Sequence, residues 1–336
     1  MGRIEELVDR MTLEEQVSLL SGEDFWSLPA IDRLGVGKLR VTDGPNGARG
    51  GGSLIGGVKS AAFPVGIALG ASWNVRLLTE VGTALAEEVK SKGAHVSLAP
   101  TVNLHRSVSN GRNFECYSED PILTASLAVG YIEGLQGQGV SATIKHFAGN
   151  ESEIDERALR ELYLVPFEWA VKRAGAWGIM SSYNKLNGTF TSENPWLLDQ
   201  VLRKEWHYDG VVMSDWFGSH STAPTVNAGL DLEMPGPPRD RGEKLVAAVE
   251  AGEVSRETLR ARVLDVLRLM ERTGALDDHS EWVERADDRA EHRALIRRAG
   301  AEGAVLLKNL GELLPLSGSG KIAVIGPNAK VAQIMG

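Results

Sequence analysis

The segment Gly210-Val211-Val212-Met213-Ser214-Asp215 is an apolar run of strand length that ends in a carboxylate. Four other short apolar runs end in polar residues or a turn in the same way: residues 38–42 before Asp43, 95–98 before Ala99-Pro100, 142–144 before Lys145-His146, and 178–180 before Ser181-Ser182-Tyr183. Helix-length segments separate the runs, and this alternation is typical of a parallel α/β fold. Over roughly 200–250 residues it favours a (β/α)8 barrel, although a doubly wound open sheet would give a similar pattern.

Two helices are marked by their ends. Thr12 with Glu15 three residues later is a capping box, which predicts a helix that Gly22 stops. Ser255 predicts the start of another helix and Gly274 its end, because serine caps N-termini and glycine tolerates the left-handed conformation of a C-terminus. Between these two residues the apolar side chains recur at helical spacing: Leu259, Val263, Val266, Leu267 and Met270.

The sequence beyond this helix predicts a second unit. We expect a barrel domain over residues 1–275, followed by a charged linker over residues 276–291, which is poor in apolar side chains. A further helix is expected around residues 294–307, and Lys321-Ile322-Ala323-Val324-Ile325 has the pattern of a strand. One strand cannot form a domain, so we expect residues 292–336 to be the incomplete start of a second α/β unit.

Composition excludes several functions. At 336 residues the chain can bury a large core, and its 43% hydrophobic and 24% charged content is ordinary for a globular protein. The formal charge of −9 argues against nucleic acid or an anionic membrane as a partner. Cys116 is the single cysteine, and the N-terminus has no apolar signal-peptide core. We therefore expect a cytoplasmic protein, or a secreted one if a leader was removed.

Asp215 is the first candidate catalytic residue. It follows a β-branched run and precedes Trp216, whose indole offers an apolar face to a sugar ring. A retaining glycosidase needs one carboxylate as nucleophile and a second about 5–5.5 Å away as acid/base. The alternative is that Asp215 caps the next helix.

Three further segments could bind a polar ligand. Lys145 and His146 could donate to neighbouring hydroxyl groups, although a histidine at a strand end is often structural. Asp43 and Arg49 lie in a turn-rich segment that could also be an ordinary surface turn. Arg112 could clamp hydroxyl groups while Glu115 or Glu119 holds it, or its loop could be a solvated, salt-bridged one.

Phosphate and metal sites are not expected. The glycine-rich stretch before Lys59-Ser60 lacks the Gly-Lys-Ser triplet of a phosphate-binding loop, because Val58 precedes the lysine. No pattern of metal ligands occurs, so we expect neither a metal nor a cofactor.

Taken together, the motifs resemble glycoside hydrolase family 3, in its β-glucosidase branch. The resemblance runs from about Met11 to the last residue, in the family's order. The matching segments are Asp43-Gly44-Pro45-x-Gly47-x-Arg49, Gly111-Arg112-Asn113-Phe114-Glu115, Tyr117-Ser118-Glu119-Asp120-Pro121, Lys145-His146-Phe147, Met180-Ser181-Ser182-Tyr183-Asn184, Ser214-Asp215-Trp216, Glu302-x-x-Val305-Leu306-Leu307-Lys308-Asn309 and Ile322-Ala323-Val324-Ile325-Gly326-Pro327.

The resemblance implies a retaining, exo-acting hydrolase with Asp215 as nucleophile, and a barrel followed by an α/β sandwich domain. It implies that Tyr183 sits against the nucleophile, that Met180 lines the pocket and that Trp216 forms part of its wall. The residues it implies for holding the hydroxyls of the terminal sugar are Asp43, Arg49, Arg112, Lys145 and His146.

This sequence departs from the family pattern in three places. The branch carries its acid/base glutamate in the second domain, and none of Glu115, Glu119, Glu151 or Glu153 matches that motif, so we expect another domain or chain to supply it. The segment after Glu153 is shorter than in relatives. Ala148-Gly149-Asn150 replaces the Pro-Gly-His-type loop of the hexosaminidase branch, which makes N-acetylglucosaminidase activity unexpected.

Other functions stay open at this point. Within the family, β-xylosidase or α-arabinofuranosidase is the nearest alternative to β-glucosidase, since one carbon in a pocket is worth only ~1–3 kcal/mol. A non-catalytic sugar-binding fragment is a second alternative. A phosphate-binding barrel enzyme is disfavoured because Asp231 and Glu233 are acidic where a phosphate site would lie.

Overall fold

The computed structural model describes residues 2–51, 57–149, 153–281, 283–318 and 320–331. Asn150 and Glu151, and most of the glycine-rich stretch before Lys59, lie outside these ranges. No helix in the described ranges is long and apolar enough to cross a membrane.

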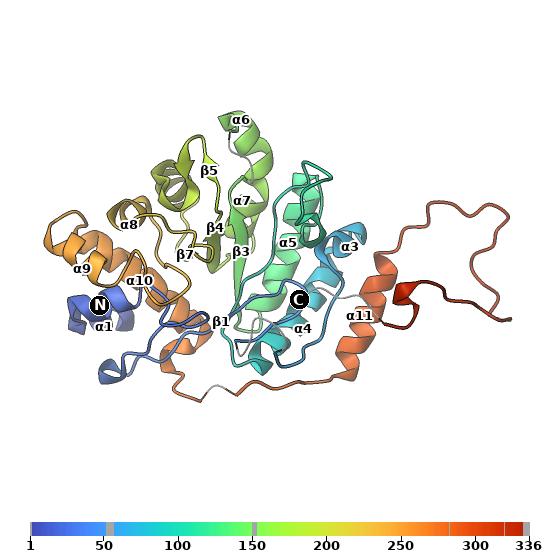
Figure 1. Ribbon diagram of the computed structural model, residues 1–336, viewed down its shortest axis with the longest axis horizontal. Coiled ribbons are helices and arrows are strands. Elements are labelled where there is room, and N and C mark those ends of the chain that lie inside the picture. The colour runs from blue at the N-terminus through green and yellow to red at the C-terminus, as the bar shows by residue number, and fades with distance from the viewer. Residues whose placement is uncertain (1, 52–56, 150–152, 282, 319, 332–336) are drawn as a thin grey trace.

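A parallel sheet forms the centre of the molecule, with its strands in the order β1-β2-β3-β4-β7 (Figure 1). All four neighbouring pairs are parallel, so the carboxyl ends of the five strands lie at one edge. Each strand is buried along its length, as expected for a parallel sheet covered by helices. The strands are β1 (Val41–Thr42), β2 (Val96–Ser97), β3 (Ser141–Phe147), β4 (Gly178–Ser181) and β7 (Val211–Met213).

Short bridges close this sheet into a barrel. Leu232 pairs in parallel with Met213 of β7, and Glu233 pairs in parallel with Ser21. Ser27 then pairs antiparallel with Arg40, next to β1. The expected α/β barrel is therefore confirmed, but one part of its circle runs antiparallel and is not built of regular strands. The Asp24 carboxylate turns the chain there by accepting from the N–H groups of Trp26 and Ser27.

Helices cover the outside of the sheet. The closest pair is α4 with α5, where Gly82 and Gly134 let the backbones touch: a Cβ at Gly134 would lie 2.2 Å from the Thr79 carbonyl oxygen. A small hairpin, β5 (Lys185–Leu186) and β6 (Thr189–Phe190), follows β4. The α-helices are α1 (Arg3–Arg10), α2 (Leu13–Ser18), α3 (Gly66–Ala71), α4 (Val75–Ser91), α5 (Pro121–Gln136), α6 (Glu156–Ala158), α7 (Val165–Lys172), α8 (Ala223–Ala228), α9 (Glu243–Glu250), α10 (Arg256–Thr273) and α11 (Ala290–Glu302).

The two helices with marked ends form as expected. Thr12 and Glu15 make both bonds of the capping box of α2, although that helix ends at Ser18, before Gly22. Ser255 caps α10 through the Thr258 N–H, and Gly274 ends it in the left-handed conformation. The C-terminal helix was expected at residues 294–307; α11 instead begins at Ala290 and ends at Glu302, where Gly303 packs against the Ala68 carbonyl oxygen of α3.

The expected linker lies against the barrel. Asp278 bonds the His95 ring at 3.0 Å, and the Arg285 carbonyl oxygen accepts from the buried Lys92 ammonium group. Beyond the linker, His292 of α11 contacts Glu88 at 2.8 Å. These contacts fix the path of the chain from α10 to α11.

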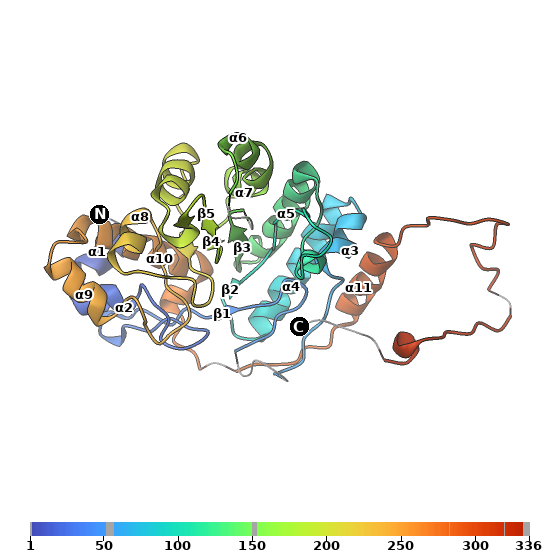
Figure 2. The same ribbon diagram turned by 45° about the horizontal axis from the view of Figure 1, so that its top comes forward.

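The strand expected at residues 321–325 is not formed, which corrects that prediction. Figure 2 shows the chain after α11 running outward from the barrel, and Ile322, Val324 and Ile325 are largely exposed. A strand needs a partner for its backbone hydrogen bonds, and none of the described residues pairs with this segment.

Candidate active site

The predicted site residues gather at the carboxyl edge of the sheet. Asp43 directly follows β1, Lys145 and His146 end β3, Met180 lies in β4, and Asp215 follows β7. Because these strands are parallel neighbours, residues from distant parts of the sequence meet in one place.

Asp215 is nearly buried and its carboxylate is held from two sides. The Trp216 N–H donates to Oδ1 at 2.7 Å, and His146 Nε2 lies 3.5 Å from Oδ2. Burial raises the pKa of Asp215, and the Trp216 N–H, the Tyr183 hydroxyl and the Lys145 charge offset this rise only in part. Burial therefore leaves the charged carboxylate less stabilised than in water, which suits a nucleophile.

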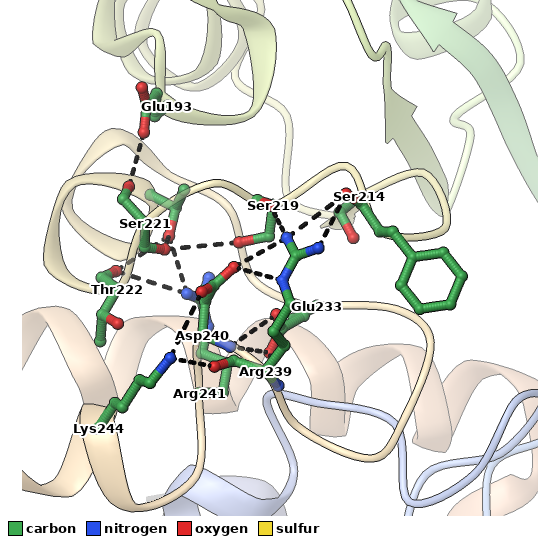
Figure 3. Close-up of polar contacts among 12 residues, drawn as sticks. Glu193, Ser214, Ser219, Ser221, Thr222, Glu233, Arg239, Asp240, Arg241 and Lys244 are labelled. Carbon is green, nitrogen blue, oxygen red and sulfur yellow. Dashed lines mark hydrogen bonds and ion pairs between the residues drawn. The ribbon is translucent and has the colours of Figure 1, made fainter.

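Asp215 does not cap a helix, so the alternative reading of this residue is wrong. The next helix, α8, begins at Ala223, and the Asp215 side chain bonds only its own loop and the site. Its loop is braced by the segment after Glu233, as Figure 3 shows. The Met234 N–H donates to Ser214 Oγ at 2.9 Å, and the Arg239 guanidinium donates to the Ser219 carbonyl oxygen.

The segment after Glu233 is itself held in place by hydrogen bonds. The Asp240 N–H donates to the buried Glu233 carboxylate at 2.9 Å, and Lys244 donates to the Arg239 carbonyl oxygen at 2.7 Å (Figure 3). Glu233 also belongs to the closing bridge of the barrel. The backbone that carries the nucleophile is thus tied to the barrel wall.

Lys145 and Asp43 form an ion pair beside the nucleophile. Lys145 Nζ lies 2.7 Å from Asp43 Oδ1, with the lysine side chain 4% and the aspartate side chain 33% exposed. Burial alone would raise the pKa of Asp43, but the neighbouring Lys145 and Arg49 charges lower it overall. The pair therefore presents a fixed carboxylate and a fixed ammonium group to any hydroxyl that enters the site.

Arg112 is oriented by Glu115, as one of the two sequence alternatives predicted. Arg112 Nε donates to Glu115 Oε1, and Thr101 Oγ1 donates to Glu115 Oε2 at 2.7 Å. Glu115 is buried whereas Arg112 is half exposed, so the carboxylate fixes the base of a guanidinium whose outer part is free to bind a ligand. Glu119 is exposed and plays no part in this contact.

Aromatic side chains form one wall. The Trp216 ring lies 5.3 Å from the Trp26 ring, and its Nε1 donates to the Phe25 carbonyl oxygen at 3.2 Å. The Tyr183 hydroxyl donates to the Trp216 carbonyl oxygen at 2.8 Å and is half exposed, next to Asp215. Met180 is buried among the barrel's core residues beneath this wall.

Sequence reasoning missed Asn103, Thr101 and the two aromatic residues Phe25 and Trp26. Asn103 bonds His146 at three points. A polar residue beyond the end of the second apolar run was the signal that could have found it. The described ranges hold no group of three histidine, cysteine or acidic side chains placed to bind a metal ion.

Comparison with known proteins shows which family the chain resembles over most of its length. Residues 39–269 match the model of the family described as glycosyl hydrolase family 3 N terminal domain. A β-glucosidase of Rhizobium radiobacter is 67% identical over 99% of the chain, which covers 42% of that protein. β-Glucosidase B of Emericella nidulans is 48% identical over 94% of the chain, which covers 38% of it.

Solved structures of β-glucosidases are similar to this chain along nearly its whole length. The β-glucosidase of Kluyveromyces marxianus in complex with glucose superposes with a TM-score of 0.89, at 40% identity over 94% of this chain and 40% of that one. β-Glucosidase 3B of Thermotoga neapolitana in complex with glucose gives 0.86, at 38% identity over 94% and 48% of the two chains. This chain thus spans about two fifths of the length of the curated relatives it matches.

Proposed function

Because the chain belongs to glycosyl hydrolase family 3, we propose that it carries the nucleophile and the terminal-sugar pocket of a retaining, exo-acting β-glucosidase. The substrate is a β-glucoside or oligosaccharide whose terminal non-reducing glucose enters the mouth of the barrel. The observation that carries this proposal is the Asp215 carboxylate, held at the mouth between the Trp216 N–H and His146 and ringed by fixed hydroxyl-binding groups.

Two displacements at one carbon make up the reaction. An Asp215 oxygen attacks the anomeric carbon, the bond to the aglycone oxygen breaks, and that oxygen takes a proton from a general acid. Water then attacks the same carbon and gives its proton to the same residue acting as base, which releases β-glucose and frees Asp215. Two inversions restore the original configuration.

The charged groups around Asp215 would bind the sugar. The Lys145–Asp43 pair offers one donor and one acceptor at a fixed spacing, and Arg49 lies close enough to Asp43 to lower its pKa. Arg112, which is held by Glu115, lies close enough to Asp215 and Asp43 for their charges to raise its pKa. Trp216 would form the apolar wall against which the ring lies.

We propose that the general acid comes from a further domain or chain. Glu115 is the buried glutamate nearest to the hydroxyl-binding groups, and both of its oxygens are already bonded, to Arg112 and Thr101. With both oxygens accepting hydrogen bonds inside the protein, neither is placed to deliver a proton to an aglycone. The greater length of the relatives is consistent with a missing acid, which the resemblance places in the α/β sandwich domain.

The sugar preference can be tested, with the domain or chain that supplies the acid present, by comparing kcat/KM on aryl β-glucoside, aryl β-xyloside and aryl α-arabinofuranoside. We expect the glucoside to be preferred by about 10- to 200-fold over the xyloside, since a pocket gains ~1–3 kcal/mol from one further group. A higher value on the xyloside or the arabinofuranoside would make the corresponding activity the function of the site.

The pH dependence follows from the pKa of Asp215. Only the ionised carboxylate attacks, so kcat/KM should fall as the pH drops through a pKa that burial has raised above the usual aspartate range. Tyr183→Phe removes a hydroxyl beside Asp215 that lowers this pKa when its proton turns from the Trp216 carbonyl oxygen to the carboxylate. We expect the acid limb of its kcat/KM profile to move to higher pH than in the parent. A limb that stays in place or moves to lower pH would contradict this role of Tyr183.

A further inference from the structure

Asn103 contacts His146 at three points, and its own orientation is fixed by the backbone. Its Nδ2 donates to the His146 carbonyl oxygen at 3.0 Å, and its Oδ1 accepts from the His146 N–H at 2.9 Å. One bond needs the amide nitrogen and the other needs the amide oxygen. The side-chain amide therefore has only one orientation that satisfies both.

This orientation decides which ring nitrogen of His146 carries the proton. Asn103 Oδ1 lies 3.2 Å from His146 Nδ1, and an amide oxygen can only accept a hydrogen bond. Nδ1 must therefore be protonated. In the neutral ring Nε2 then has a lone pair and no hydrogen, and this is the nitrogen that faces Asp215 Oδ2 at 3.5 Å.

The charge on the ring matters because Asp215 is the nucleophile of the proposed function, on which this inference rests. An imidazolium at 3.5 Å would pair with the carboxylate and lower its nucleophilicity. The charged groups that face His146 are Asp215 from the loop after β7, Arg112 from the loop before α5, and Lys145 from β3. Burial, with the Lys145 and Arg112 charges, holds the pKa of His146 well below its usual range.

We propose that Asn103 is a positioning residue that keeps the ring proton of His146 on Nδ1, so that Nε2 of the neutral ring accepts a hydrogen bond from a sugar hydroxyl and leaves the charge of Asp215 unpaired. The ligand class is a hydroxyl donor, because two acceptors, Nε2 and Asp215 Oδ2, face each other across the gap. A sugar hydroxyl that lies beside both acceptors can donate its hydrogen bond to one of them.

The first test reads the ring directly. In the protein labelled with ¹⁵N at histidine, long-range ¹H–¹⁵N spectra distinguish the two tautomers and the imidazolium, and His146→Gln identifies the His146 signals by their loss. We expect a single Nδ1–H tautomer at neutral pH. An Nε2–H tautomer or an imidazolium would overturn the proposal, and neither result depends on enzymatic activity.

The second test changes the charge at position 103. In Asn103→Asp the carboxylate stabilises the imidazolium, so the His146 signals should become those of the charged ring at neutral pH. We expect kcat/KM on an aryl β-glucoside to fall about ten-fold or more below neutral pH and to recover as the pH rises. Asn227→Asp, at an exposed position on α8, adds the same charge away from the site and should change neither readout.

Three outcomes separate the explanations. A loss in Asn103→Asp that is equal at every pH, with the His146 signals unchanged, would mean a merely structural role and overturn the proposal. Absence of covalent labelling of Asp215 by dinitrophenyl 2-deoxy-2-fluoro-β-glucoside in the parent, with the Nδ1–H tautomer present, would refute the proposed function and leave the tautomer assignment standing. A pH-dependent loss together with a charged ring supports both.

Discussion

Asp215→Asn should reduce kcat on an activated aryl β-glucoside by at least about a thousand-fold, because the amide cannot form the glycosyl intermediate. The dinitrophenyl glucoside is the suitable substrate, since its leaving group needs little protonation. The affinity for glucose should change little, as the hydroxyl-binding groups stay in place. Rates and the Kd for glucose, measured on the same preparation, give both values.

The same variant should not lose stability. A carboxyl whose pKa is raised in the folded state adds most to the free energy of unfolding below its unfolded pKa, and this contribution is lost as the pH rises through the folded pKa. Above the folded-state pKa the ionised Asp215 therefore destabilises the fold, and asparagine removes that charge. A variant that loses activity because it unfolds would instead show a lower Tm, which separates the two causes.

Asp231→Ala should have the largest effect on stability. Asp231 is fully buried. It accepts from Arg203 at 2.6 Å and from the Val212 N–H of β7 at 2.7 Å, and it forms an ion pair with Arg262 at 2.9 Å. Its removal leaves two nearly buried guanidinium groups with Asp265 as the carboxylate that still pairs with them. Breaking such a cluster costs about 3–5 kcal/mol.

Asp265 can replace part of the lost negative charge. We therefore expect the free energy of unfolding to fall by about 3 kcal/mol, at the lower end of that range. Burial, followed by the Asp231 charge, raises the pKa of Asp265 to about 6. Removal of Asp231 lets Asp265 ionise more readily. Denaturant unfolding measures the effect, with Asp199→Ala as the matched control: Asp199 pairs with Lys204 at 2.6 Å but at the surface, and should cost under about 0.5 kcal/mol. Equal losses in the two variants would contradict this role of the cluster.

The sequence was sufficient to predict the sheet and the positions of most candidate site residues, because both depend on local patterns. A buried strand followed by a polar residue places that residue at the carboxyl edge, and Asp43, Lys145, His146 and Asp215 all lie there. Capping residues act within one helical turn, which explains why Thr12 and Ser255 identified their helices.

Features that depend on distant partners were not predicted. The closure of the barrel joins Glu233 to Ser21 and Arg40 to Ser27, and the segments around Ser21 and Ser27 have neither the alternation nor the apolar run of a strand. The expected strand at residues 321–325 has the right composition but no partner among the described residues. The local sequence determines whether a segment can form a strand, but it does not determine whether another strand lies beside it.

Asn103 shows the same limit within the site. Pro100 interrupts the apolar run that begins with β2, so the sequence predicts that the strand ends there. In the structure Thr101 still forms a bridge with Lys145, and the Val102 N–H donates to the Lys145 carbonyl oxygen at 2.8 Å. This continued pairing with β3 carries Asn103 to His146.

Covalent trapping of the chain by dinitrophenyl 2-deoxy-2-fluoro-β-glucoside tests the nucleophile most directly, because that step needs a nucleophile and little help from an acid. Intact mass should increase by one fluoroglucosyl group, and peptide mapping should place that group on Asp215, with no increase in Asp215→Asn. An unlabelled parent protein, or a label on another carboxylate, would contradict the account; an unlabelled protein that still bound glucose would indicate a sugar-binding module instead.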